Sequence, residues 1–247
     1  MNDAAYACAA IANLFKHREK KDMRIQRFIH KGIAVLFLTT ISAAAAAQSG
    51  ANLPADLNPD SLARLPYLQR KNLDEQAKSI FDVLPGRSPE GVLSGPLAFA
   101  AYNPTAAKAL FDLHNAAVGD GTLNAHVREL AIMVACRETN YDLEWNAHEA
   151  SALRAGVDAN VLDVVLNNRP LAGINEADAV VIRFGRQMFG DRHVDSATFA
   201  KARELFGDSG VMDMVAVMNT YAVSGYFAIA VDEHMPAGQS MMERNAR

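Results

Sequence analysis

The sequence predicts an all-α fold, organised as a single domain of about eight helices. Half of the 247 residues are hydrophobic but only 7% are aromatic, so the core must be built largely from Ala, Leu, Val and Met. Ala, Leu and Met are strong helix formers. No stretch alternates apolar and polar residues as a half-buried strand does, and no hairpin turn is evident.

The first three expected helices have clear boundary signals. A helix over 73–84 ends at Pro85-Gly86. The next, 104–119, has Asn103 as its cap and Pro104 at its first position, where proline is favoured. Asn124 caps a third helix, 125–138. Its middle, 130–136, is apolar on every side, which is typical of a helix buried all round.

The most informative stretch is 140–156, NYDLEWNAHEASALRAG, which we interpret as one helix. Asn140 can cap its start, and Gly156 stands where a left-handed end is usual. At a period of 3.6 residues, one face carries Tyr141, Glu144, Trp145 and His148. Glu144 and His148 are four residues apart, so their side chains can touch. Taken alone, the pair is consistent either with an exposed helix pair or with the wall of a pocket.

The remaining helices follow from caps and apolar spacing. Asp158 and Asp195 stand where caps are expected, and Asn167 to Pro170 breaks the pattern between them. The last predicted helix is long and apolar and contains Tyr221 and Gly225. These signals predict helices over 159–166, 176–189, 196–206 and 211–231.

The N-terminus predicts a secretory signal peptide. A basic lead from Met23 to Lys31 precedes an apolar run from Gly32 to Ser42, and Ala43 to Ala47 offers a small-residue cleavage site. An uncleaved membrane anchor is the alternative, although the run is short for a bilayer span. We expect translation to start at Met23 and a periplasmic or secreted mature chain from Gln48, without stable membrane insertion. The predicted parts are a signal region 1–47, a flexible leader 48–72, a domain 73–236 and a tail 237–247.

Charge and cysteine content exclude some functions. Residues 1–47 hold seven Lys/Arg and three Asp/Glu, which leaves 17 basic against 25 acidic residues in the rest of the chain. An acidic body without a basic stripe argues against nucleic-acid binding. After cleavage the only cysteine is Cys136, which has no partner for a disulfide or a CxxC pair. Its apolar surroundings predict a small buried hydrophobe.

Motifs for bound cofactors and metals are missing from the sequence. Neither GxGxxG nor GxxxxGK[ST] occurs, GxSxG is absent, and Ala152 replaces the second histidine of HExxH after His148. The seven histidines show no metal-ligand spacing. We therefore expect neither a cofactor nor a metal.

Three pieces of sequence together resemble the carboxymuconolactone decarboxylase-like family, which includes the alkylhydroperoxidase D proteins. The pieces are Arg128-Glu129-Leu130-Ala131-Ile132, Tyr141-x-x-Glu144-Trp145-x-x-His148 and Ala155-Gly156-Val157. Gly95-Pro96, Asn103-Pro104 and Gly225-Tyr226-Phe227 are similar to the longer, non-thiol members. The resemblance implies an alkylhydroperoxidase D-like helical bundle that forms homo-oligomers, trimers or hexamers, with sites near subunit contacts.

The resemblance also shows which chemistry this chain lacks. In the alkylhydroperoxidase branch a glutamate, a CxxC pair and a histidine form a thiol site. Glu129 and His148 match the glutamate and the histidine, but Tyr141 and Glu144 occupy the two cysteine places. Thiol peroxidase chemistry needs a thiolate and a resolving cysteine, so it is not expected here.

The decarboxylase branch implies a different use of the same positions. Glu144 and His148 could share the proton that must be added after carbon dioxide leaves a lactone acid, and Glu129 could orient His148. Tyr141 and Trp145 would wall the substrate, and either Arg128 or Arg137 would hold its carboxylate. Three hypotheses result: a cofactor-free enzyme acting on a small carboxylated or lactone-like molecule, an antioxidant peroxidase or peroxiredoxin that uses Cys136, and a non-catalytic oligomeric binding protein.

Overall fold

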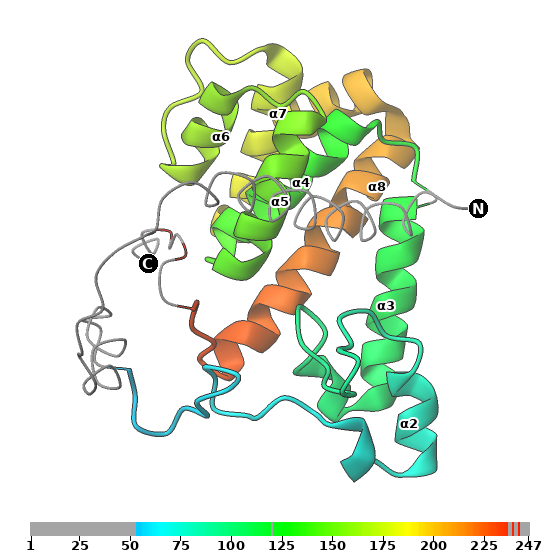
Figure 1. Cartoon of the computed structure of the whole chain (residues 1–247). Coiled ribbons are helices and arrows are strands. Elements are labelled where there is room, and N and C mark those ends of the chain that lie inside the picture. Colours follow the sequence, from blue (N-terminus) through cyan, green and yellow to red (C-terminus); the bar gives the residue numbers. More distant parts are fainter. Residues whose placement is uncertain (1–52, 120, 237–238, 240–241, 243–247) are drawn as a thin grey trace, which may run out of the picture. The chain divides into compact units, whose positions relative to one another are not determined.

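The computed structural model describes residues 53–119, 121–236, 239 and 242, and this part of the chain is helical (Figure 1). It contains seven α-helices and no β-strand, only isolated bridges, which confirms the predicted all-α class. The predicted signal region 1–47 and its cleavage site lie outside the described residues, as does most of the tail. No helix in the described part is long and apolar enough to cross a membrane.

Helix α4 (Ala125–Glu138) forms the centre of the main hydrophobic core. It packs against α5 (Asp142–Arg154), α6 (Ala159–Leu166), α7 (Glu176–Arg186) and α8 (Ser196–Ala230). Every residue from Leu130 to Arg137 is buried, as the apolar run predicted. Asn124 caps the helix by accepting a hydrogen bond from the Val127 amide at 2.9 Å. A helix enclosed on all sides fixes the positions of the side chains at its start.

The 16-residue helix α3 (Pro104–Gly119) begins at the predicted proline and packs against α8. Together with α2 (Glu75–Phe81), the turn η2 (Ala100–Tyr102) and the loop between them it builds a second apolar cluster, which includes Phe81, Leu84, Leu93 and Leu97. Helix α2 is shorter than the expected 73–84, because Asp74 caps it at one end and the chain turns after Asp82 at the other.

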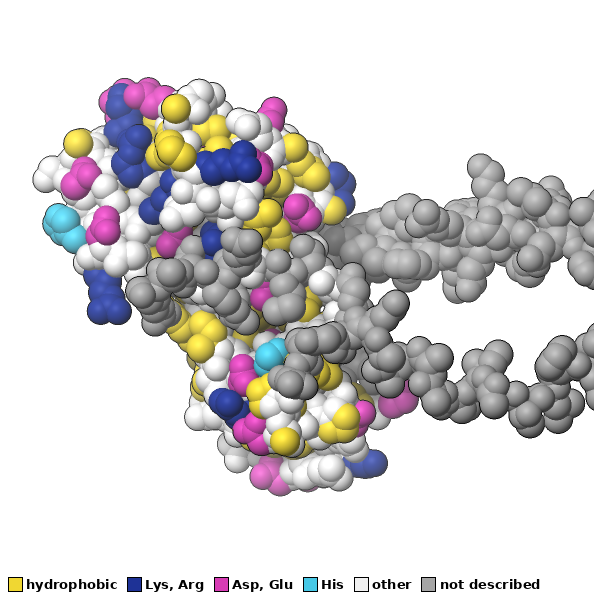
Figure 2. All heavy atoms as spheres, turned by 90° about the vertical axis from the view of Figure 1, so that its left-hand side faces the viewer, with side chains coloured by type: hydrophobic (Ala, Val, Ile, Leu, Met, Phe, Trp, Pro, Cys, Tyr) yellow, Lys and Arg dark blue, Asp and Glu magenta, His cyan; other side chains and the backbone are white. Residues whose placement is uncertain are grey.

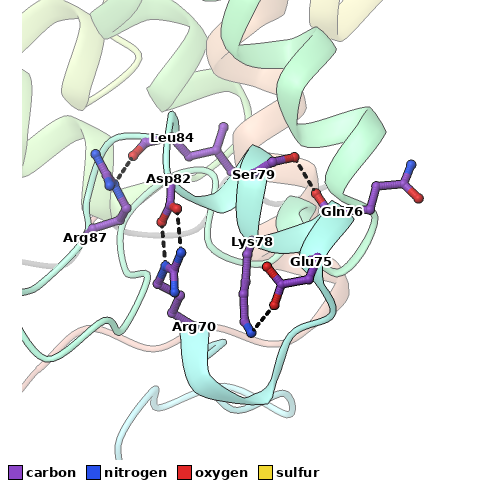
Figure 3. A network of polar contacts seen from close by, with 8 residues as sticks. All are labelled: Arg70, Glu75, Gln76, Lys78, Ser79, Asp82, Leu84 and Arg87. Atoms are coloured by element: carbon purple, nitrogen blue, oxygen red, sulfur yellow. Dashed lines mark hydrogen bonds and ion pairs between the residues drawn. The ribbon is translucent and has the colours of Figure 1, made fainter.

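Residues 53–72, part of the segment expected to be a flexible leader, make several contacts with the rest of the described chain. Ala63 is fully buried, the Arg64 amide donates to the Val231 carbonyl at 2.7 Å, and Tyr67 stacks on Phe99. The turn η1 (Arg70–Asn72) is tied to the end of α2 by two hydrogen bonds of 2.7 Å from Arg70 to Asp82 (Figure 3). The composition of this segment is polar, but a few apolar side chains suffice to anchor it.

Figure 3 also shows how α2 and the following loop are held. Lys78 pairs with Glu75 at 2.7 Å, Ser79 donates to the Gln76 carbonyl, and Arg87 Nε donates to the Leu84 carbonyl at 2.8 Å. Exposed ion pairs add little to stability. The fully buried Leu84 and Leu93 are therefore the main anchors of this loop.

Helix α5 begins two residues later than expected. Asn140 adopts the left-handed region (φ 51°) and ends the α4 turn, with the Tyr141 amide donating to the Cys136 carbonyl at 2.8 Å. Tyr141 is the residue before the helix, and its side chain makes no capping bond. Gly156 has φ 89° and ends α5 as predicted. The displaced start leaves Glu144 in the first turn of the helix.

The last two predicted helices, 196–206 and 211–231, form one element, α8, with a kink at Gly207 (φ 70°, ψ 173°). Between α7 and α8 a π-helical turn, η3 (Gln187–Asp191), replaces the expected end of the 176–189 helix. On the face shown in Figure 2, basic and acidic side chains are interspersed among apolar ones.

Gly185 provides a test of how tightly α4 is packed. A Cβ at this position would lie 2.3 Å from Val134 Cγ1, whereas at Gly190 it would meet nothing within 4 Å. We expect Gly185→Ala to lower the free energy of unfolding by about 1–3 kcal/mol through overpacking. Urea or thermal denaturation measures this, with Gly190→Ala as the control. Equal stability of the two variants would contradict the packing described here.

Candidate active site

Three predicted residues meet at the interface of α4 and α5. His148 Nδ1 lies 3.0 Å from Glu129 Oε2, and His148 Nε2 lies 3.3 Å from Glu144 Oε2. The side chains of Glu129, Glu144 and His148 are 14%, 7% and 22% exposed. The three side chains therefore converge, and the imidazole is held between two carboxylates. The catalytic roles of the three residues stay a prediction.

Local structure accounts for this arrangement. Glu129 lies in the first turns of α4, where the helix axis is fixed by burial on all sides. Glu144 and His148 are one turn apart on α5, so their side chains lie on the same face. The packing of α5 against α4 then brings that face to Glu129. A charged group in such an enclosed place needs a partner, and His148 serves both carboxylates.

Two further residues join this cluster that the sequence did not single out as site residues. Tyr221, on α8, places its hydroxyl 3.2 Å from His148 Nε2 and 3.4 Å from His114 Nε2, on α3. The rings of His148 and Tyr221 meet edge to face, with centroids 5.0 Å apart. Along the chain, Tyr221 is 73 residues from His148 and 107 residues from His114. Sequence periodicity predicts contacts within one helix and not contacts between residues so far apart, so these contacts are seen only in the folded structure.

The charges in the cluster follow from its contacts. Burial by itself would lower the pKa of His148, but the hydrogen bonds that the ring donates to Glu129 and Glu144 outweigh burial and raise that pKa to about 9. Burial lowers the pKa of His114 and raises that of Tyr221 well above its usual value of 10. At neutral pH His148 is therefore an imidazolium that donates from both ring nitrogens, while His114 and Tyr221 are uncharged.

A cavity of about 60 Å³ opens beside Tyr221 on the side of α3. Its apolar walls are Pro85, Pro96, Leu97, Leu110 and Phe111. Its polar lining includes three members of the cluster around His148, namely His114, Glu144 and Tyr221. Among the described residues that line it, none is lysine or arginine. We call this the Tyr221 cavity.

The two predicted aromatic substrate contacts differ in their placement. Tyr141 is buried and lines a second, larger cavity of about 230 Å³ near the start of α5, together with Asp142, Gly225 and Glu233. Burial, with a contribution from Glu144, raises the pKa of Glu233 to about 7. Trp145 is 3% exposed and belongs to the main hydrophobic core. Substrate contact by either aromatic ring stays a prediction.

The two arginines that the sequence left as alternatives are also distinguished. Arg137 is 5% exposed and donates from Nε to the Leu166 carbonyl at 2.6 Å and from its guanidinium to Asn140 at 2.9 Å. Arg128 Nε is buried and has no hydrogen-bond partner within the described residues. Arg137 therefore ties helices together, whereas Arg128 retains a donor for another group.

Cys136 is completely buried within α4 and is the only free cysteine among the described residues. Burial, assisted by the negative charge of Glu144, raises the pKa of its thiol well above 9. A thiolate is the reactive form of cysteine, so this residue is unreactive in the folded chain. The prediction of a small buried hydrophobe is confirmed.

The fold and the site define an all-helical protein with an alkylhydroperoxidase D-like core. Residues 104–182, which include Glu129, Glu144 and His148, match the model of the Carboxymuconolactone decarboxylase family. This segment of the chain is therefore similar to that family. No curated protein matches it by sequence.

Solved structures share the fold. One is the debrominase Bmp8 in complex with 2,3,4-tribromopyrrole, with 16% identity, a TM-score of 0.53, and 69% of this chain and 90% of that chain covered. A peroxidase-related protein from Silicibacter sp. TM1040 has 19% identity, a TM-score of 0.52 and coverages of 68% and 90%. An alkylhydroperoxidase AhpD core protein, peroxidase-related, from Ralstonia eutropha JMP134 has 24% identity, a TM-score of 0.53 and coverages of 71% and 93%. At these identities the likeness concerns the fold alone.

The raised pKa of His148 predicts a pH-dependent contribution to stability. In the unfolded chain a histidine titrates near 6.5, so the carboxylate contacts stabilise the fold fully below that pH and are lost as the pH rises through about 9. We expect a loss of about 3 kcal/mol across this window. The measurement is the free energy of unfolding of the wild type minus that of His148→Gln at pH 6 and pH 10. If this difference in free energy of unfolding were the same at both pH values, His148 would not be an imidazolium in the folded protein.

Proposed function

We propose that this chain is a cofactor-free enzyme that decarboxylates, or rearranges by proton transfer, a small lactone-type or carboxylated substrate. The observation that carries the proposal is the His148 imidazolium held between Glu129 and Glu144 beside a cavity. A charged imidazole with carboxylate partners is a proton donor with a defined direction. The match of residues 104–182 to the Carboxymuconolactone decarboxylase family model supports the substrate class.

The proposed reaction needs one proton and no electron acceptor. The bond between the carboxylate carbon and the ring breaks, carbon dioxide leaves, and the electron pair spreads over the unsaturated lactone. A proton then adds to a ring carbon. His148 supplies it by way of Glu144, which lies 3.3 Å from His148 Nε2 and lines the Tyr221 cavity. Water restores the proton on His148, so the net reaction consumes one proton from solvent.

Each remaining residue has a supporting role in this proposal. Glu129 fixes the imidazole ring through Nδ1 and keeps it charged. Arg128, with a buried and unpartnered Nε, holds the substrate carboxylate before it leaves. The neighbouring Arg137 is already engaged with Leu166 and Asn140, which favours Arg128 for this role.

The thiol peroxidase alternative is less well supported. It needs a thiolate and a resolving thiol, and Cys136 is fully buried with its thiol pKa raised. Acid–base chemistry instead uses groups that are ionised and hydrogen-bonded at neutral pH. A non-catalytic binding protein would not need an imidazolium shared by two carboxylates, although it would also hold a ligand in the cavity.

Substitutions within the cluster test the proposal. We expect Glu144→Gln and His148→Ala each to reduce kcat on a lactone acid such as carboxymuconolactone at least about 100-fold, because each removes the proton donor. Carbon dioxide release gives the rate, and circular dichroism checks folding. Arg128→Gln should raise KM, and Arg154→Gln, on an exposed part of α5, is the control. Full turnover by both cluster variants would defeat these roles.

We also propose that the chain is exported, because a basic lead, an apolar run and a small-residue cleavage site occur in order from Met23 to Ala47. Expression of the full sequence in a Gram-negative host should give a periplasmic product starting near Gln48. Mass spectrometry of the N-terminus measures this. A cytoplasmic product with residues 23–47 intact would contradict export.

A further inference from the structure

The apolar wall of the Tyr221 cavity is built from two segments of the chain. Three of its apolar lining residues, Pro85, Pro96 and Leu97, come from the segment before α3, outside the family-matched residues 104–182. Leu110 and Phe111 complete the apolar wall from α3. The loop carrying the two prolines is anchored by the fully buried Leu84 and Leu93. The loop before α3 therefore supplies an anchored part of the cavity wall.

The size and charge of the cavity restrict what can enter. Its volume of about 60 Å³ is roughly twice the volume that one water molecule occupies in the liquid, so it accepts a group of a few heavy atoms. Glu144 contributes a carboxylate to its lining, and no described lining residue is cationic. Burying an anionic group there would be costly, because nothing would pair with it. An uncharged group that is mostly apolar fits these limits.

The hydrogen bonds around Tyr221 leave one donor directed at such a group. Because His148 is protonated, its Nε2, which lies 3.2 Å from the Tyr221 oxygen and 3.3 Å from Glu144, cannot accept the hydroxyl proton of Tyr221. That proton must go to another acceptor. Its other neighbour, His114 Nε2, is 3.4 Å away, which is long for a bond from a hydroxyl. A ligand oxygen in the cavity would make a shorter bond. His114 Nδ1 is also buried without a partner in the described structure.

We infer that the Tyr221 cavity receives the uncharged carbonyl end of the substrate, with the Tyr221 hydroxyl donating a hydrogen bond to the carbonyl oxygen. The inference deepens and rests on the proposed function, because the carbonyl of a lactone is where negative charge accumulates once carbon dioxide has left. Tyr221 then stabilises that oxygen. Arg128 holds the carboxylate outside the cavity, so the substrate class is a neutral lactone or ketone carbonyl joined to a carboxylate.

The test uses two size-matched probes and measures binding rather than turnover. Butanone and propionate have similar volumes, but only propionate is charged. Ligand-observed NMR titrations of the folded protein at pH 7 should show butanone binding at least about tenfold more tightly. Tyr221→Phe keeps the ring and loses one neutral hydrogen bond, so it should weaken butanone binding roughly three- to tenfold.

A matched pair of variants on α3 locates the site. Leu110→Trp places a large ring in the cavity wall and should abolish butanone binding, whereas Leu113→Trp, at an exposed position of the same helix, should leave it within about twofold. Circular dichroism confirms that both variants fold. If Leu110→Trp does not fold, the Tyr221→Phe result alone decides.

Two outcomes overturn the inference: propionate binding as tightly as butanone, or butanone binding that Tyr221→Phe leaves unchanged. The failure of the proposed function looks different. In that case the probes behave as expected and the cavity stands as a carbonyl site, but lactone acids are not decarboxylated or rearranged and Glu144→Gln changes no rate.

Discussion

The structure of the site depends on one constraint, which is that the charge of Glu129 at the start of a buried helix must be paired. Helix α4 packs against α5, α7 and α8, and the Glu129 side chain is only 14% exposed, so it recovers little hydration from solvent. His148 Nδ1 lies 3.0 Å from Glu129 Oε2 and supplies the partner, so the imidazole is largely buried as well. A buried imidazole alone would be neutral, but a second carboxylate, Glu144, contacts its other nitrogen and keeps it charged. The contacts that pair the two carboxylates with His148 are thus the same contacts that keep its ring protonated.

This constraint extends to α8 and α3. Since both nitrogens of His148 carry a proton, the Tyr221 hydroxyl, 3.2 Å from Nε2, cannot donate to the ring and lies beside the same nitrogen as the Glu144 carboxylate. Burial keeps Tyr221 un-ionised, and it keeps the nearby His114 neutral as well. The cluster therefore has a charged half between α4 and α5 and an uncharged half between α8 and α3. The Tyr221 cavity adjoins the uncharged half, with Glu144 at the boundary between them.

Local sequence signals predicted most of the fold and part of the site. The bounds of α3, α4 and α6 follow from Asn103-Pro104, Asn124 and Asp158, because capping is a property of neighbouring residues. Glu144 and His148 could be paired from their spacing, and Glu129 joined them through the family resemblance. Tyr221 and His114 could not be predicted, since their contacts depend on how α3 and α8 pack across α4 and α5. The contacts of residues 53–72 could not be predicted for a similar reason: Ala63 is buried, and Tyr67 is partly buried, by distant parts of the chain.

Tyr141 and Glu144 stand where the resemblance to the alkylhydroperoxidase D proteins places a CxxC pair, so a similar helical frame carries different side chains. The start of a helix favours negative charge, which in a thiol site stabilises a thiolate. Here Glu144 in the first turn of α5 receives that stabilisation, and its charge raises the proton affinity of His148 one turn later. A carboxylate cannot be oxidised as a thiolate can, but it can accept a proton from one group and pass it to another. In the proposed function, the start of α5 therefore serves to hold a proton between Glu144 and His148, beside a small cavity that has no cationic residue among its described lining.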